Sequence, residues 1–183
     1  MEQLLYNKES LLANLISFIQ EAESFDKYWK KFEHILERSA EIPFGVHLAI
    51  FIEPYLSFIL EGKKRVESRF SSNRIAPYKK IRPGDLIYLK YSGGPIVGFC
   101  EVIDVWFYRL DPSTWLNIRQ EFTRELCIQD PNFWKEREHA SYATLMKLGQ
   151  VARINPIHIS KHDRRGWIVL NPGETNKKLD DDY

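Results

Sequence analysis

Residues 62–69, with the sequence GKKRVESR, constrain the fold of this chain more than any other segment. They follow an apolar segment, residues 48–60, and begin with a glycine, which suits a turn. The side chains then alternate as in a β-strand, with Val66 on one face and Glu67 and Arg69 on the other. A carboxylate and a guanidinium that point inward from a strand are costly to bury, so stability alone does not explain them. The segment therefore predicts a polar site mounted on a β-sheet.

The basic residues of the chain are concentrated around this segment. Residues 61–82 contain eight Lys or Arg and two Glu, whereas residues 1–60 contain five basic and nine acidic residues. The formal net charge of the whole chain is only +1, so the protein as a whole does not attract polyanions. A basic segment in a nearly neutral protein still creates a local field that attracts anions. For residues 79–80 the alternative is a solvated charged loop.

The sequence indicates a cytoplasmic protein with no metal or cofactor. Cys100 and Cys127 lack metal-binding spacing, and free thiols favour a reducing compartment. No apolar run is long enough to cross a membrane, and the first residues show no signal-peptide pattern. His158 and His162 are four residues apart, but Pro156 argues against the helix that would align them on a metal. No Gly-rich phosphate loop points to a nucleotide cofactor.

The first part of the chain predicts a helical extension over residues 1–42. Apolar residues repeat at helical spacing over residues 11–19 and again over residues 28–36. Ser24 and Asp26 offer a capping break between the two stripes. These observations predict a helical hairpin that ends at the Pro and Gly of residues 42–45.

Short strands and inserted helices are predicted over residues 46–170, followed by a polar, disordered tail over residues 171–183. Gly98 predicts a bend and Pro156 a kink, while residues 142–148 are ambiguous. The pattern suits an α+β fold built on a small, partly open β-barrel of about five or six strands. The predicted strands are residues 47–52, 66–70, 86–90, 96–107, 150–159 and 167–170, and the predicted helices are residues 54–60, 111–126 and 131–138.

In their order along the chain, these elements resemble the ASCH domain, a branch of the PUA-like superfamily. The resemblance implies a PUA-like β-barrel whose groove, lined by the motif and neighbouring loops, holds RNA or a modified nucleobase. Some members of the family hydrolyse N4-acylated cytidine, and at least one resembles a ribonuclease. The elements that carry the resemblance are the strand 48–52, the helix 54–60, the motif 62–69, the PGD turn 83–85, the Gly-rich hairpin 92–98 and the closing strand 167–170.

The amidohydrolase branch of this family uses a lysine and, three residues later in the same motif, a threonine, with a glutamate elsewhere. The lysine falls on Lys64 of this chain, but the threonine position is occupied by Glu67. The resemblance therefore leaves the acylcytidine chemistry in doubt for this sequence.

A nucleic-acid-binding module for RNA or a modified nucleoside is the first hypothesis. Its proposed binding residues are Lys63, Lys64, Glu67, Arg69, Arg74, Tyr91 and Arg165, with the cations on phosphate and with Glu67 and Tyr91 on the base. For Glu67 the alternative is a salt bridge to Arg69 or Lys64, and for Tyr91 a ring that covers one end of the barrel.

Two other functions stay open. A hydrolase acting on RNA or an N-acylated nucleoside would use Glu67 to activate water and Lys64 to stabilise developing negative charge. A protein-interaction adaptor would use the N-terminal helices, which either pack on the barrel or dimerise through Trp29 and Phe32. The oligomeric state, and whether residues 111–140 cover the groove, also stay open.

Overall fold

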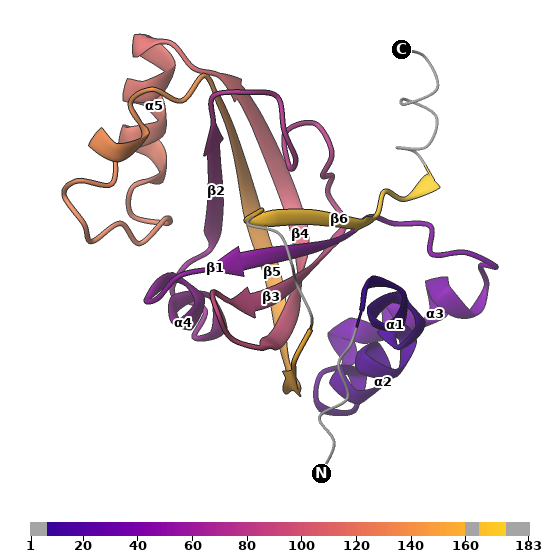
Figure 1. Cartoon of the computed structure of the whole chain (residues 1–183). Helices are drawn as coiled ribbons and strands as arrows, with labels where there is room; N and C mark the ends of the chain where they lie inside the picture. Colours follow the sequence, from indigo (N-terminus) through magenta and orange to yellow (C-terminus); the bar gives the residue numbers. More distant parts are fainter. Residues whose placement is uncertain (1–6, 160–164, 175–183) are drawn as a thin grey trace.

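The computed structural model describes residues 7–159 and 165–174. Six strands form one mixed sheet in the order β2-β5-β4-β3-β1-β6, in which β1 and β3 are parallel and the other pairs antiparallel. The sheet curls into a half-barrel with helices around it (Figure 1), which confirms the predicted α+β fold class. Most of the 171–183 tail lies outside the described residues. The strands are β1 (Val46–Phe51), β2 (Val66–Ser71), β3 (Leu86–Tyr91), β4 (Ile96–Arg109), β5 (Tyr142–Ile157) and β6 (Trp167–Asn171).

Two long strands, β4 and β5, form the spine of the sheet. β5 is continuous through residues 142–148, which the sequence left ambiguous, because each of these residues pairs with β2, β4 or both. The predicted bend at Gly98 corresponds to a register shift between Ile96 and Gly98. A Cβ at this glycine would lie 2.5 Å from the carbonyl oxygen of Ala152, so the strands approach too closely for any side chain.

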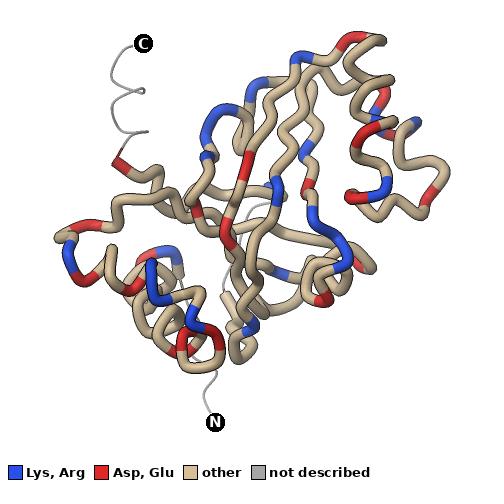
Figure 2. Tube along the Cα trace, turned by 180° about the vertical axis from the view of Figure 1, so that it is seen from behind, with Lys and Arg blue, Asp and Glu red and all other residues tan. Residues whose placement is uncertain are grey.

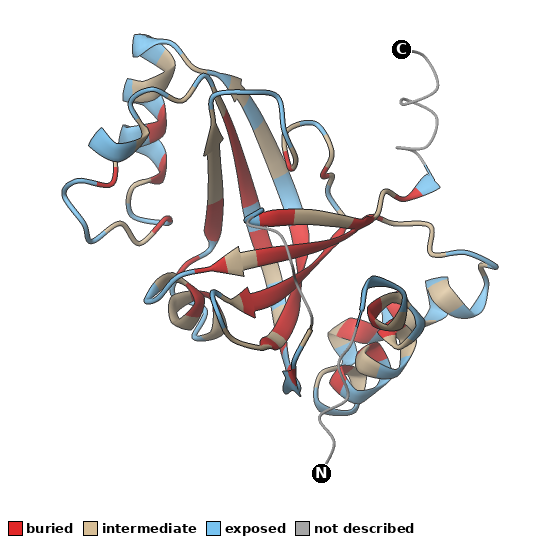
Figure 3. Ribbon diagram, in the orientation of Figure 1, coloured by how far each residue is buried: buried red, intermediate tan, exposed pale blue. Residues whose placement is uncertain are grey.

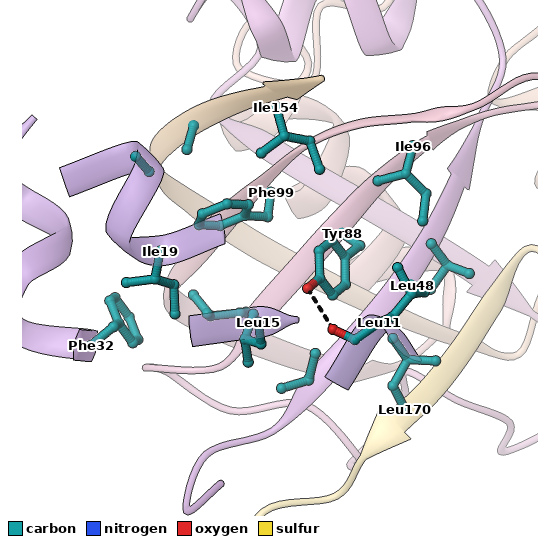
Figure 4. Packing of buried hydrophobic residues seen from close by; sticks show 14 of the residues in the cluster. Leu11, Leu15, Ile19, Phe32, Leu48, Tyr88, Ile96, Phe99, Ile154 and Leu170 are labelled. Carbon is teal, nitrogen blue, oxygen red and sulfur yellow. Dashed lines mark hydrogen bonds between the residues drawn. The ribbon is translucent and has the colours of Figure 1, made fainter. Parts of the chain in front are cut away.

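The N-terminal helices pack against one face of this sheet. Their apolar stripe shares one core with the strands (Figure 4). In this core, Trp29 lies edge-on to Phe99 with ring centroids 4.7 Å apart. The Tyr88 hydroxyl also donates a hydrogen bond to the Leu11 carbonyl at 3.1 Å. Trp29 and Phe32 are buried in this core, so the extension packs on the barrel through them. The helical elements are α1 (Lys8–Ala13), α2 (Leu15–Phe25), the 3-10 helix η1 (Lys27–Trp29) and α3 (Lys30–Glu37).

The break predicted at Ser24 and Asp26 lies at Asp26, between α2 and α3, whereas Ser24 is part of α2. The Asp26 side chain accepts a hydrogen bond from the Tyr28 backbone N–H at 2.9 Å and so caps the following turn. A second break, at Asn14, divides the first predicted helix into α1 and α2. Figure 3 shows buried residues along the sheet and on the inward sides of these helices, as expected for two packed layers.

An insertion between β4 and β5 covers the outer side of β2. It begins with α5 (Pro112–Phe122), which is shorter than the predicted helix of residues 111–126 and is capped by Asp111, whose side chain accepts a hydrogen bond from the Thr114 N–H at 2.8 Å. The predicted helix over residues 131–138 is wrong: the segment forms turns and one 3-10 helix, η2 (Lys135–Arg137). Asp130 accepts from the N–H of Asn132, only two residues on, which closes a turn instead of starting a helix.

Candidate functional site

The motif enters the sheet through a tight turn after α4 (Tyr55–Leu60). Gly62 adopts the left-handed conformation, with φ of 71°, and the N–H groups of both Lys63 and Lys64 donate to the carbonyl of Phe58. This turn directs the side chains of the two lysines to different sides. Lys63 stays at the surface, where its ammonium pairs with Glu61 at 2.6 Å, whereas Lys64 turns inward. Figure 2 shows the run of basic residues leading into β2.

Lys64 is 4% exposed, and acceptors surround its ammonium group. The Nζ atom donates to the carbonyls of Val66 at 2.7 Å and Leu126 at 3.1 Å, and it lies 3.4 Å from Oε2 of Glu67. Three acceptors match the three N–H groups of an ammonium. Burial lowers the pKa of Lys64, and the charge of Glu67 opposes this shift.

Glu67 is 5% exposed and forms ion pairs with two cations. Its Oε1 atom lies 2.9 Å from Nε of Arg69, while its Oε2 atom faces Lys64. Val66 packs in the opposite direction, in a core beneath the insertion. The alternation predicted for this strand is therefore present, and both salt bridges considered for Glu67 are formed.

Arg69 joins the two edges of the half-barrel. From the edge strand β2, its Nη2 donates to the Ile50 carbonyl in β1 at 3.0 Å, and its Nη1 donates to the Gly166 carbonyl just before β6 at 3.2 Å. The guanidinium also lies over the rings of Phe51 and Trp167, 4.9 and 5.3 Å from their centroids. The side chain thus combines an ion pair, two carbonyl contacts and two ring contacts.

These residues line a cavity of about 310 Å³, here called the motif cavity. The insertion supplies part of its wall, so residues 111–140 do border the groove. Phe133 and Arg137 come from this insertion, and the Arg137 guanidinium lies 3.8 Å from the centroid of the Phe133 ring. The aromatic lining residues are Phe51, Tyr55, Phe70 and Phe133, and the charged ones are Lys64, Glu67, Arg69 and Arg137.

The other proposed binding residues lie outside the motif cavity. Arg74 lies over the Tyr142 ring at 5.5 Å, and Tyr91 pairs with Phe51 in the β1–β3 register and packs against the core inside the half-barrel. Arg165 lines a neighbouring cavity that it shares with Arg69. The structure therefore brings together Lys64, Glu67 and Arg69, but not the surface lysine of the motif, Arg74 or Tyr91.

Of the aromatic and charged residues in the cavity wall, five were not proposed from the sequence: Phe51, Tyr55, Phe70, Phe133 and Arg137. Tyr55 fell in the helix predicted over residues 54–60, and Phe133 and Arg137 fell in the helix predicted over residues 131–138. No motif links them to residues 62–69. Phe133 and Arg137 reach the site only through the fold of the insertion, which returns to Phe70 through aromatic contacts.

A buried polar relay lies next to this site. His47 is fully buried, its Nδ1 accepts a hydrogen bond from Nε1 of Trp167 at 3.2 Å, and its Nε2 lies 3.1 Å from Oδ2 of Asp85. Asp85 also accepts from the backbone N–H groups of Gly45 and Arg82 at 2.7 and 2.8 Å. The relay fixes the indole that lies over Arg69, and hence one side of the site.

In the part of the chain that the structure describes, no helix is both long and apolar enough to cross a membrane. No curated protein matches the sequence. The chain is similar to the crystal structure of ASCH from Zymomonas mobilis, with 15% identity over 73% of this chain and 91% of that one, and a TM-score of 0.55. The crystal structure of a serine-to-alanine mutant of the same Zymomonas mobilis protein gives 17% identity over 74% and 94%, with a TM-score of 0.56.

The family model of the ASCH domain matches residues 50–158, more than half of the chain. The matched segment contains the motif, the edge strand β2 and the insertion, and it ends at the last residues of β5. The half-barrel agrees with the PUA-like architecture of that family. The chain therefore belongs to the ASCH domain family, a PUA-like family associated with RNA binding.

Proposed function

We propose that the motif cavity binds one nucleotide of a single-stranded RNA. The observation that carries the proposal is the combination of four aromatic side chains with three basic residues and one acidic residue around one cavity. Aromatic rings offer stacking surfaces for an unpaired base, and the excess of positive charge suits its phosphate. A cavity of about 310 Å³ lies at the lower end of the sizes usual for ligand pockets.

The charged residues of the cavity divide between holding the site and meeting the ligand. Lys64 and Arg69 are committed to backbone carbonyls and to Glu67, so they fix the carboxylate in place. The carboxylate is an acceptor for the amino or imino N–H groups of a base. Arg137, with 29% of its side chain exposed, is the most accessible cation of the set and contacts the phosphate. Lys63 and Arg74 contact only flanking phosphates.

The test is fluorescence anisotropy with a labelled RNA hexamer at about 50 and 200 mM salt. Arg137→Gln should weaken binding and reduce the salt slope by about one, because one phosphate contact is lost. Arg38→Gln, which removes the same charge from an exposed position at the end of α3, is the matched control and should bind as the wild type does. Equal affinities for the two variants, both folded, would contradict the proposal.

Hydrolysis of an N-acylated nucleoside in the same cavity is the second candidate. It is favoured by the buried lysine with a lowered pKa, 3.4 Å from the carboxylate of Glu67. Water would add to the acyl carbon as Glu67 takes its proton. The amide C–N bond would then break, the amine leaving with that proton and the acyl group becoming a carboxylic acid.

The two candidates differ in whether product forms. Incubation with an N-acylated cytidine, followed by chromatography, measures free cytidine directly. Glu67→Gln should abolish its formation if the carboxylate is the base, and thermal unfolding of the variant checks that the fold is retained. Turnover that persists in this variant would exclude Glu67 as the base, and an absence of product with wild-type protein would leave the binding function alone.

A further inference from the structure

A second cavity, of about 610 Å³, lies on the other side of Arg69 and Phe70. These two consecutive residues of β2 line both cavities, so the second cavity is adjacent to the motif cavity. Its remaining wall comes from the loop after β2, which contributes Ile75, from Thr144 in β5, and from Arg165 and Trp167 at the start of β6. We propose that this second cavity holds the nucleotide next to the one in the motif cavity, an inference that rests on the proposed function.

The charge of the second cavity favours an anionic ligand. Both charged residues that line it are arginines, Arg69 and Arg165, and among the described residues no acidic side chain lines it. The loop that follows β2 also carries Arg74, Lys79 and Lys80. This loop holds much of the basic segment seen in the sequence, yet it contributes nothing to the motif cavity. A second phosphate is the group that this local positive charge attracts.

The apolar lining of the second cavity suits a base rather than a bare anion. Phe70 and Trp167 supply aromatic side chains, and Ile75 is 60% exposed at the edge. An exposed apolar side chain beside two arginines suits a ligand that has both a flat hydrophobic face and a charged group. A free inorganic phosphate would use the arginines and leave the side chain of Ile75 in water.

Because the two cavities share Arg69 and Phe70 in their walls, a single chain that spans both suits the site better than two separate molecules. Arg69 lies at the boundary, and its guanidinium is immobilised by the Ile50 and Gly166 carbonyls, so the boundary is rigid. Consecutive nucleotides of a single strand place a base on each side of a shared phosphate. The site therefore recognises at least two linked nucleotides and discriminates against free nucleosides by affinity.

The experiment compares the four ribonucleoside 5′-monophosphates with the 5′-phosphorylated dinucleotides pApA, pCpC, pGpG and pUpU by isothermal titration. For at least one base, the dinucleotide should bind about tenfold more tightly than the monophosphate, because a second base stacks and a second phosphate is neutralised. Ile75→Asp combined with Arg165→Gln should weaken dinucleotide binding far more than monophosphate binding and so remove this advantage. Arg38→Gln should retain it.

The outcomes separate the two proposals. Monophosphates that bind as tightly as dinucleotides would overturn the second subsite and leave the proposed function standing. A double variant that weakens monophosphate and dinucleotide by the same factor, while its melting temperature is unchanged, would show that the second cavity is not a separate subsite. Wild-type protein that binds neither class, nor the RNA hexamer, would overturn both proposals.

Discussion

Arg69 donates a hydrogen bond across the mouth of the half-barrel to the carbonyl of Gly166, which also accepts from the backbone N–H of Ile50. One carbonyl oxygen thus links β1 and the start of β6 to the Arg69 side chain of the opposite edge strand, β2. The arginine, proposed from the sequence as a phosphate contact, has a structural task at the boundary of two cavities. The walls of both cavities and the closure of the sheet depend on the same guanidinium.

Replacing Arg69 should therefore reduce stability as well as binding. Arg69→Gln loses the ion pair to Glu67 and at least one of the two carbonyl contacts, which should lower the free energy of unfolding by roughly 2–4 kcal/mol. Urea denaturation measures the change. Arg38→Gln is again the control and should change stability by less than about 0.5 kcal/mol. An Arg69→Gln protein as stable as that control would show that the guanidinium does not close the sheet.

Burial of Lys64 predicts that the free energy of unfolding increases as the pH rises into the alkaline range. Burial holds the pKa of Lys64 below its ordinary value of 10.5, so between the folded-state pKa and pH 10.5 the unfolded chain binds more protons. Stability rises with pH wherever the unfolded state binds more protons. The wild type should therefore gain stability relative to Lys64→Met as the pH increases towards 10.5, measured by urea denaturation across that range. Parallel pH profiles would contradict a lowered pKa.

The relay through His47 predicts energetic coupling with Trp167. Trp167→Phe keeps a ring over Arg69 but leaves Nδ1 of His47 without its donor, which should cost about 1–3 kcal/mol. A double-mutant cycle with His47→Leu should give a coupling energy between about 0.5 and 3 kcal/mol. Additive effects in the cycle would show that the hydrogen bond between the indole N–H and the imidazole contributes nothing to the free energy of unfolding.

Because β4 and β5 approach closely at Gly98, adding one methyl group there should lower the stability of the protein. Gly98→Ala places a Cβ 2.5 Å from the backbone oxygen of Ala152, which can move only with its strand, and should destabilise the protein by about 1–3 kcal/mol. Gly149→Ala is the matched substitution. Its Cβ meets the end of the Ile103 side chain at 2.7 Å, which can rotate away, so its cost should be smaller. The reverse order in thermal unfolding would contradict this account.

Much of the sheet could be predicted because short segments with local signals form its strands. The strand of the motif and the helix begun by Asp111 depend on side-chain alternation and on one cap, which are legible within a few residues. Residues 142–148 could not be predicted as a strand, because they are buried between β2 and β4 and so lose the simple alternation. The helix predicted after Asp130 is wrong because the same residue type caps helices and closes turns.

The site could be predicted only as far as the motif reaches. Glu67 and Arg69 lie two residues apart on one strand, so their shared face follows from the sequence. Arg137 is brought to them by the packing of Trp115 and Trp134 on Phe70, and no local pattern encodes that contact. The different directions of Lys63 and Lys64 depend on the left-handed turn before them, which a count of charges does not reveal.

The packing of the N-terminal helices also sets an order of events during synthesis. The helices leave the ribosome before the residues that cover their apolar stripe, Tyr88, Phe99 and Ile154, have been made. Because a domain acquires its fold as the chain emerges, this stripe is not fully covered until β5 has been translated. The helices are thus made well before they are fully buried, and a ribosome stalled before residue 154 would leave part of their hydrophobic surface exposed.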